Sequence, residues 1–138
     1  MGKPMAKNLL KAGYELTVYD LVEAAVAELE AAGAKRAANN AEVAAASEVV
    51  ITMVPNSPQV KTAVLGPKGV LEGAKPGTIL VDMSSINPIA SKEVCAEVEK
   101  KGCFMLDAPV SGGEPKAIDG TLAIMVGGKE EIFDKVKD

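Results

Sequence analysis

The segment 107–117, with the sequence DAPVSGGEPKA, places a carboxylate, a hydroxyl, two adjacent glycines and a lysine in one short loop after an apolar run. Adjacent glycines such as Gly112 and Gly113 let a backbone adopt positive φ and approach a ligand closely. The N–H groups exposed in this way, beside the hydroxyl of Ser111, can hold a small anion such as a carboxylate. The segment therefore predicts an anion-binding loop. The alternative is a plain turn, which explains neither Ser111 nor the prolines on either side.

The composition excludes several other kinds of site. The net charge is −4 and no basic cluster is present, so neither nucleic acid nor an anionic membrane is expected as a partner. The sequence contains no histidine, which excludes a His-activated nucleophile. Its two cysteines lack the spacing of metal ligands, so no metal site is expected. We expect these cysteines to be reduced, and neither a membrane-length apolar run nor a signal peptide is recognised, which favours a cytoplasmic protein.

Short apolar runs alternate with segments of helical spacing, which is typical of an α/β protein. Four runs are predicted to be buried strands, and a fifth lies near the end: 16–19, 49–54, 79–81, 104–106 and 122–126. The chain has two Tyr, two Phe and no Trp, so its core must be built from aliphatic side chains, as in a parallel sheet with helices on both faces. Its 138 residues are enough for one such domain.

The clearest helix signal begins at Asn87, which can cap a helix whose first residue is Pro88. Gly102 is expected to end this helix. The wet face is predicted to pair Glu97 with Lys101 at i,i+4. The buried face is predicted to be a stripe of small and branched side chains. This stripe consists of Ala90, Val94 and Val98.

Ligands of open α/β sheets bind beyond the carboxyl ends of the strands, so the residues after each predicted strand are candidates. Asp20 follows the first strand, where a carboxylate can accept both hydroxyls of an adenosine ribose and favours NAD over NADP. Alternatively, Asp20 only caps the next helix. Two prolines stiffen residues 54–58 after the second strand, and this backbone can lie along a dinucleotide. Ser84 and Ser85 follow the third, where such residues cap a helix more often than they bind a ligand.

With these motifs, the sequence resembles the dinucleotide-binding domain of the β-hydroxyacid dehydrogenase family. The resemblance covers essentially all 138 residues and rests on 1–9, 107–116, 120–122 and 125–128. Segments 53–57 and 111–116 are most similar to the members that reduce tartronate semialdehyde. The resemblance implies a Rossmann-like parallel sheet with helices on both faces, NAD or NADP as the cofactor, and a small carboxylate as the substrate.

The resemblance also implies roles for individual residues. Ser111, Gly112 and Gly113 correspond to donors that hold the substrate carboxylate. Gly2 corresponds to the last glycine of the G-x-G-x-x-G fingerprint, where a helix and a strand pack closely. The implied cofactor contacts are Gly2, Asp20, Val54, Pro55, Gln59 and Ser85. No metal ligand is implied.

Two departures from the family pattern lead us to expect a fragment. Family members begin with a strand and two further fingerprint glycines, whereas this sequence begins at Met1-Gly2. We therefore expect a sheet truncated at its first strand, a central one in the order 3-2-1-4-5-6, with two neighbours left unpaired. The family's catalytic lysine belongs to a following helical domain, and Lys116 does not correspond to it. No catalytic residue is therefore expected within residues 1–138.

Three interpretations of function remain open. In the first, the chain derives from an oxidoreductase that transfers a hydride between NAD(P) and a small 3-hydroxy or 3-oxo acid, with tartronate semialdehyde to glycerate as the expected reaction. In the second, it is a non-catalytic nucleotide-binding or self-assembling module, a homo-oligomer whose exposed sheet edges are covered by another copy. In the third, it is a partial product whose structure reports only a fold.

Overall fold

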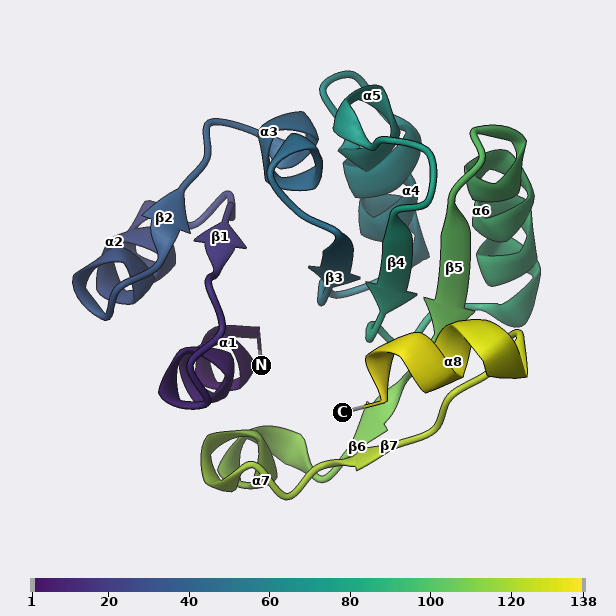
Figure 1. Cartoon of the computed structure of the whole chain (residues 1–138). Helices are drawn as coiled ribbons and strands as arrows, with labels where there is room; N and C mark the ends of the chain where they lie inside the picture. The colour runs from purple at the N-terminus through teal and green to yellow at the C-terminus, as the bar shows by residue number, and fades with distance from the viewer. Residues whose placement is uncertain (1, 138) are drawn as a thin grey trace.

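The computed structural model describes residues 2–137, in which strands and helices alternate along the chain (Figure 1). The helices are α1 Gly2–Lys11, α2 Glu23–Ala31, α3 Asn40–Ala45, α4 Ser57–Leu65, α5 Val70–Gly73, α6 Pro88–Lys100, α7 Gly113–Asp119 and α8 Glu130–Val136. The strands are β1 Thr17–Val18, β2 Lys35–Arg36, β3 Val49–Thr52, β4 Ile79–Asp82, β5 Phe104–Asp107, β6 Val110–Ser111 and β7 Ala123–Ile124. Met1, part of the first family motif, lies outside the described residues. None of the described helices is long and apolar enough to cross a membrane.

The parallel strands form two groups that lie side by side (Figure 1). Strands β3, β4 and β5 pair in that order, with Val50 opposite Leu80 and Leu80 opposite Met105. Strands β1 and β2 form a separate parallel pair. Within residues 2–137 no hydrogen-bonded ladder joins β1 to β3, so each of these strands has an unpaired edge. The parallel sheet is confirmed, and the break falls between the two strands that were expected to be left unpaired.

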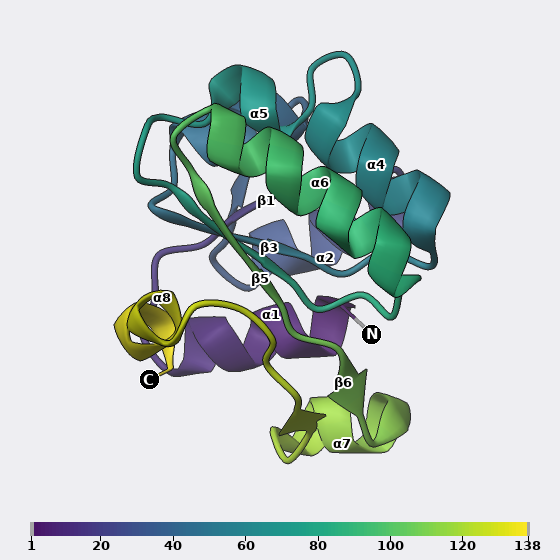
Figure 2. The ribbon, with the colours of Figure 1, turned by 90° about the vertical axis from the view of Figure 1, so that its right-hand side faces the viewer.

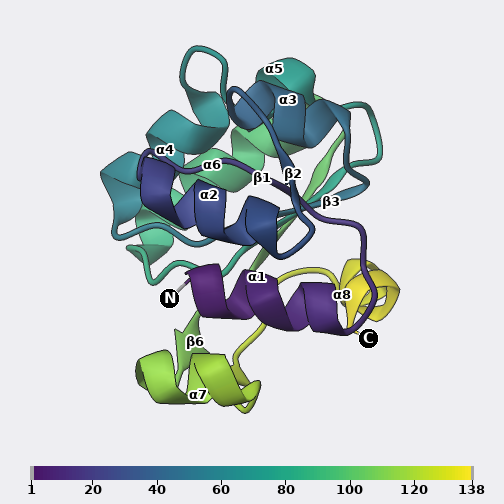
Figure 3. The ribbon, with the colours of Figure 1, turned by 90° about the vertical axis from the view of Figure 1, so that its left-hand side faces the viewer.

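Helices cover both faces of the β3-β4-β5 sheet, as predicted. Helices α4, α5 and α6 lie over one face, and α1 and α8 lie over the other (Figures 2 and 3). The first face packs a core of aliphatic side chains that includes Val50, Val60, Val64, Val70, Leu80, Val94, Val98 and Met105. The second packs Ile79, Val81 and Leu106 against Met5, Ile132 and Phe133. Burial of these two aliphatic layers is the main favourable term in folding.

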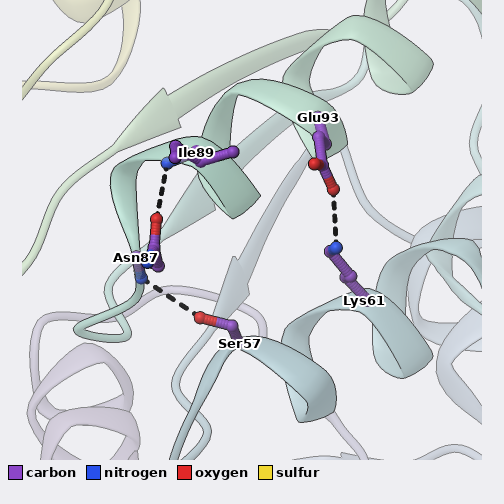
Figure 4. Close-up of polar contacts among 5 residues, drawn as sticks. All are labelled: Ser57, Lys61, Asn87, Ile89 and Glu93. Atoms are coloured by element: carbon purple, nitrogen blue, oxygen red, sulfur yellow. Dashed lines mark hydrogen bonds and ion pairs between the residues drawn. The ribbon is translucent and has the colours of Figure 1, made fainter.

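Helix α6 begins and ends where the sequence predicts. The side-chain oxygen of Asn87 accepts the N–H of Ile89 at 2.8 Å (Figure 4), and Pro88 is the first helical residue. Gly102 follows the last turn with φ +80°, as expected for a helix that ends at a glycine. The predicted stripe is buried: Val94 and Val98 are 0% exposed.

The predicted ion pair on α6 was wrong in its partner. Glu97 pairs with Lys100 at 3.0 Å rather than with Lys101. Residues three and four positions apart both lie beside Glu97 on the helix surface. The ammonium of Lys101 instead donates to the carbonyl oxygen of Leu71 at 2.7 Å, which draws it towards α5.

The segment 122–126 differs most from its prediction as a strand. Only Ala123 and Ile124 form a strand, β7, which pairs antiparallel with β6. Figure 2 shows β6 and the neighbouring α7 away from the parallel strands. The side chains of β7 are exposed, with Ile124 at 50%, whereas Val110 on β6 packs partly against the core. An apolar run alone did not reveal whether anything would pack on it.

Candidate functional site

The residues predicted to bind ligands lie beyond the carboxyl ends of the parallel strands. Asp20 follows β1, Val54 and Pro55 follow β3, and Ser85 follows β4. The glycine loop, residues 111–113, follows β5 through β6. Parallel strands end on one side of a sheet, which is where ligands of open α/β folds bind. We call this side the carboxyl edge.

Two contacts connect helix α1 to segments at the carboxyl edge. A Cβ built on Gly2 would lie 3.7 Å from Cβ of Met53, which follows β3. This distance is ordinary van der Waals contact, so the helix start lies against the segment after β3 without requiring glycine. Six residues further along, the side-chain amide of Asn8 donates to the carbonyl oxygen of Ala117 at 2.6 Å. Helix α1 thus links the segment after β3 to α7, which follows the glycine loop.

Asp20 lies in the turn between β1 and α2 and is exposed. Its Oδ1 accepts the N–H of Val22 at 2.9 Å. The cap of α2 is Val22 itself, which makes no side-chain capping bond, so the alternative in which Asp20 caps the helix was wrong. An exposed carboxylate held by a single backbone donor is free to accept hydroxyl groups of a ligand.

Ser84 positions the backbone after β3. Its hydroxyl oxygen accepts the N–H of Val54 at 2.9 Å, and the side chain is 0% exposed. Ser84 does not cap α6, because Asn87 does. Ser85, the next residue, does not cap α6 either, and it is exposed. No pattern in the sequence indicates that Ser84 bonds to Val54, which lies thirty residues away along the chain.

Contacts between α4 and α6 hold the first turns of these helices together. The hydroxyl oxygen of Ser57 accepts the N–H of Asn87 at 3.1 Å, and Lys61 Nζ lies 2.6 Å from Glu93 Oε2 (Figure 4). Gln59, on the first turn of α4, is exposed. The loops after β3 and β4, which carry predicted cofactor contacts, therefore lead into two helices that are fixed to each other.

Ser84→Ala should destabilise the fold and loosen the segment after β3. The variant leaves the N–H of Val54 without its partner, which costs about 1–3 kcal/mol when the group is buried. Urea unfolding measures this loss. Ser57→Ala is the matched control, since it removes a hydroxyl acceptor that solvent can replace. Equal losses for the two variants would contradict the role given to Ser84.

The glycine loop adopts the backbone that its sequence predicts. Gly112 has φ +137° and Gly113 has φ +71°. A Cβ on Gly112 would lie 2.6 Å from Cδ and 2.9 Å from Cβ of Lys116, so the lysine stem folds over this glycine. Ser111 is exposed at the end of β6. The two glycines and the serine hydroxyl are therefore accessible to a ligand from solvent.

A row of polar side chains, two of them buried and the third half-buried, crosses the sheet at its carboxyl edge, and the sequence analysis did not predict it. Thr52, Asp82 and Asp107 are register partners on β3, β4 and β5. Asp82 is 0% exposed, and its Oδ1 accepts the hydroxyl of Thr52 at 2.8 Å and the N–H of Ser84 at 3.1 Å. Desolvation by burial and the charge of Asp82 both raise the pKa of Asp107 above its ordinary value. We call these three residues the Thr-Asp-Asp row.

Both cysteine side chains pack within the fold. Cys103 is buried, and Cys95 is half-buried beside Glu99, whose carboxylate lies 3.1 Å from its Sγ. Burial, together with Glu99, raises the pKa of the Cys95 thiol to about 11, so it stays protonated and weakly nucleophilic at neutral pH. Within residues 2–137 no group of three or more His, Cys, Asp or Glu side chains could hold a metal ion.

A parallel sheet with helices on both faces and candidate ligand-binding loops at its carboxyl edge is the arrangement of a Rossmann-type dinucleotide-binding domain. Residues 1–138 match the family described as the NAD binding domain of 6-phosphogluconate dehydrogenase, and the chain belongs to this family, in its 3-hydroxyisobutyrate dehydrogenase-like branch.

Similar proteins include several curated dehydrogenases and a reductase. The chain is 48% identical over 137 residues to 2-(hydroxymethyl)glutarate dehydrogenase of Eubacterium barkeri, covering 99% of the chain and 46% of the relative. It is 46% identical over 133 residues to the mitochondrial 3-hydroxyisobutyrate dehydrogenase of Homo sapiens, covering 96% and 40%. Identity to 2-hydroxy-3-oxopropionate reductase of Escherichia coli is 44% over 137 residues, covering 99% and 47%. The chain thus spans less than half the length of these relatives.

The solved structures agree with this family. The 3-hydroxyisobutyrate dehydrogenase of Mycobacterium tuberculosis, determined with L-serine, superposes with a TM-score of 0.91 at 37% identity. The match covers 99% of this chain and 46% of that one. The arrangement of both strand groups and their helices is therefore that of a known dehydrogenase domain.

Proposed function

We propose that this chain is the cofactor-binding part of an oxidoreductase that transfers a hydride between NAD(P) and a small 3-hydroxy or 3-oxo acid. The observation that carries the proposal is the glycine loop, whose two positive-φ glycines and exposed serine lie on the same side of the sheet as Asp20 and Val54. The nicotinamide cofactor supplies or accepts the hydride when it is bound.

In this proposal the residues of the chain bind and orient. The hydroxyl of Ser111 and the N–H groups of Gly112 and Gly113 hold the substrate carboxylate. Asp20 accepts the adenosine ribose hydroxyls, while Val54, Pro55, Gln59, Ser85 and Gly2 line the remaining cofactor contacts. The exposure of Asp20 and of the glycine loop fits these roles. We assign no proton donor within the chain, and general acid–base help is typically worth roughly 10²–10⁴-fold in rate.

The substrate we propose is tartronate semialdehyde. Its C3 aldehyde receives the hydride from the reduced cofactor and its oxygen receives a proton, which gives glycerate and the oxidised cofactor. The similarity of segment 111–116 to reductases of this substrate and the 44% identity to 2-hydroxy-3-oxopropionate reductase support the choice. The test compares kcat/KM of the protein that carries this domain for tartronate semialdehyde, 3-hydroxyisobutyrate and L-serine. A preference for either of the latter two would overturn the choice of substrate and keep the reaction class.

We propose that NAD is preferred over NADP, and Asp20→Ala tests this preference. Arg36 on β2 is the register partner of Val18, two residues before Asp20, but its guanidinium is paired with Glu23 and Glu30. It is therefore not free to receive a 2′-phosphate. The variant should lose about tenfold or more in NAD affinity, as expected when a hydrogen bond worth roughly 1.5–3 kcal/mol to a charged group is removed, and should keep its affinity for NADP.

Calorimetric titration with each cofactor measures this difference. Glu15→Ala, at an exposed position before β1, is the control for a loss of negative charge in this part of the surface. Equal losses for NAD and NADP in Asp20→Ala would contradict a ribose-binding role.

A second candidate function rests on the open edges of β1 and β3. Val49 and Ile51 on β3 are 41% and 42% exposed, although they are apolar strand residues. Exposed strand edges are templates for pairing with another chain. The chain would then be a self-assembling nucleotide-binding module, in which a second copy covers these edges. Light scattering after size exclusion separates the two functions, since a stable monomer would count against the module.

We also propose a cytoplasmic location. Cys95 and Cys103 are both free thiols, and thiols persist in the reducing cytosol.

A further inference from the structure

The Thr-Asp-Asp row contains two buried carboxylate oxygens that have no hydrogen-bond partner. They are Oδ2 of Asp82 and Oδ1 of Asp107. The two residues are register partners on adjacent parallel strands. Neighbouring strands lie about 4.8 Å apart, and register partners project from the same face of the sheet. The two carboxyl groups are therefore neighbours, and each has one oxygen that is buried from water.

Two ionised carboxylates in this arrangement would be costly. A buried charge without a partner is strongly disfavoured, and a like charge beside it adds repulsion. A single proton removes both penalties, because one carboxyl group becomes a donor and the other accepts. The two orphaned oxygens are then each other's partners.

We propose that Asp82 and Asp107 share one proton, and that this shared proton fixes the start of the segment that leads to the glycine loop. The claim that the proton positions the glycine loop rests on the proposed function only because that function supplies the ligand of the loop.

A proton fits this place better than a metal cation. The other oxygen of Asp82 is already taken by the hydroxyl of Thr52 and the N–H of Ser84. Each aspartate then offers one buried oxygen without a partner, whereas cations such as Mg²⁺ and Ca²⁺ take six or more oxygen ligands. No third acidic, His or Cys side chain completes a metal site among the described residues.

Within residues 2–137, the segments that surround the pair carry no opposite charge that could replace the proton. On β3 the neighbour is Thr52, which is neutral, and the segment 125–128, which pairs with Asp107 through Gly127, has no titratable residue. The first turns of α4 and α6, residues 57–60 and 88–91, have none either. Helix α8 packs on the opposite face through Ile132 and Phe133. The charge that acts on Asp107 is that of Asp82, and it raises the pKa in the same direction as burial does.

The pair is mechanically connected to the glycine loop. The N–H of Asp107 donates to the carbonyl oxygen of Gly127 at 2.9 Å, and the N–H of Gly127 donates back at 2.7 Å. Beyond Asp107 the N–H of Ala108 donates to the carbonyl oxygen of Asp82 at 2.8 Å. From there the chain enters β6, which ends at Ser111. Loss of the proton leaves two negative charges at the start of this segment.

The first test is the carboxyl group itself. In the wild-type protein labelled with ¹³C at aspartate carboxyl carbons, we expect one signal of a protonated carboxyl that persists well above the ordinary titration range of aspartate. It should vanish in Asp107→Asn. Full ionisation of every aspartate by neutral pH would overturn the shared proton, and this result needs no variant that folds.

The second test is the pH dependence of folding. The pKa of Asp107 is raised in the folded state, so between its unfolded and folded values the native protein binds more protons than the unfolded chain. Stability from this group is then present at low pH and is lost as pH rises through the folded pKa, by up to tenfold in the folding equilibrium constant for each pH unit. Urea unfolding of Asp107→Asn should lack this decline, whereas the exposed control Asp119→Asn should keep it. The same decline in Asp107→Asn would overturn the proposal.

The third test separates the pair from the loop. The backbone amide signals of Gly112 and Gly113 should shift with the same pH midpoint as the carboxyl signal, and should not shift in Asp107→Asn. If the carboxyl titrates and the glycines do not respond, the positioning role is overturned while the shared proton stands. If both respond but no small carboxylate binds, the proposed function fails and this inference does not.

Discussion

Gly73→Ala is expected to lower the free energy of unfolding by about 3 kcal/mol or more, at or beyond the upper end of the usual cost of overpacking a core. Gly73 ends α5, where that helix crosses α3. A Cβ there would lie 1.8 Å from the carbonyl oxygen and 2.6 Å from the carbonyl carbon of Ala41. These are backbone atoms of a helix, so no side-chain rotation relieves the overlap. Helices α3 and α5 would have to separate.

The separation would open the core above β3. Ala44 on α3 and Val70 on α5 both belong to the buried cluster that covers this face of the sheet. For a chain of this size, 3 kcal/mol corresponds to a fall of roughly 10 °C in Tm. Thermal and urea unfolding measure the change. Gly2→Ala is the matched control, since its new Cβ would meet Met53 at an ordinary 3.7 Å. A cost for Gly73→Ala that is no larger than for Gly2→Ala would contradict the close approach of α3 and α5.

The sequence predicted best those features whose cause is local. Helix α6 is the clearest case, because the cap at Asn87, the proline at the first turn, the stripe at i, i+4 and i+8, and the glycine after the last turn all act within neighbouring residues. The positive φ of Gly112 and Gly113 was likewise predicted from two adjacent glycines. Where several local signals agree, tertiary packing has little left to decide.

Features that depend on register or on a distant partner were missed. The Thr-Asp-Asp row exists because three strands align Thr52, Asp82 and Asp107, and a single sequence does not state which residues will face each other across a sheet. Ser84 was interpreted as a cap because its true partner, Val54, lies thirty residues away. Strand β2, only two exposed and charged residues long, had no apolar pattern to reveal it.

Apolar residues that stay exposed caused the opposite error, because the sequence predicted a regular strand or burial that the fold does not provide. The run 122–126 predicts a strand by composition, but only two residues pair and both are exposed. Hydrophobicity reports a tendency to be covered, not the presence of a cover within the same chain. The same distinction applies to Val49 and Ile51, which the sequence placed in a buried strand and the fold leaves partly exposed at the edge of β3.

Gly112→Ala is expected to reduce the affinity for a small carboxylate about 10- to 100-fold, the loss that follows when hydrogen bonds to a charged group worth roughly 1.5–3 kcal/mol are withdrawn. Gly112 has φ +137° and ψ −11°, a conformation that side chains rarely adopt. Alanine would turn the backbone and with it the N–H groups that face the ligand. Because the loop is exposed, the free energy of unfolding should change far less than in Gly73→Ala. Titration with glycerate in the presence of NAD measures the affinity.

A second substitution identifies which property of Gly112 matters. Lys116→Ala in the Gly112→Ala background removes the contact at 2.6 Å with the lysine Cδ but leaves the contact at 2.9 Å with its Cβ and the positive φ. We therefore expect no rescue of affinity, whereas full rescue would mean that the lysine stem alone forbids a side chain. Gly113→Asn is the matched control, since φ +71° suits asparagine and its Cβ would meet only Cδ of Pro115, at 3.7 Å. A loss for Gly113→Asn as large as that for Gly112→Ala would show that any side chain in the loop blocks the ligand, and the backbone of Gly112 would no longer be the determinant of carboxylate binding.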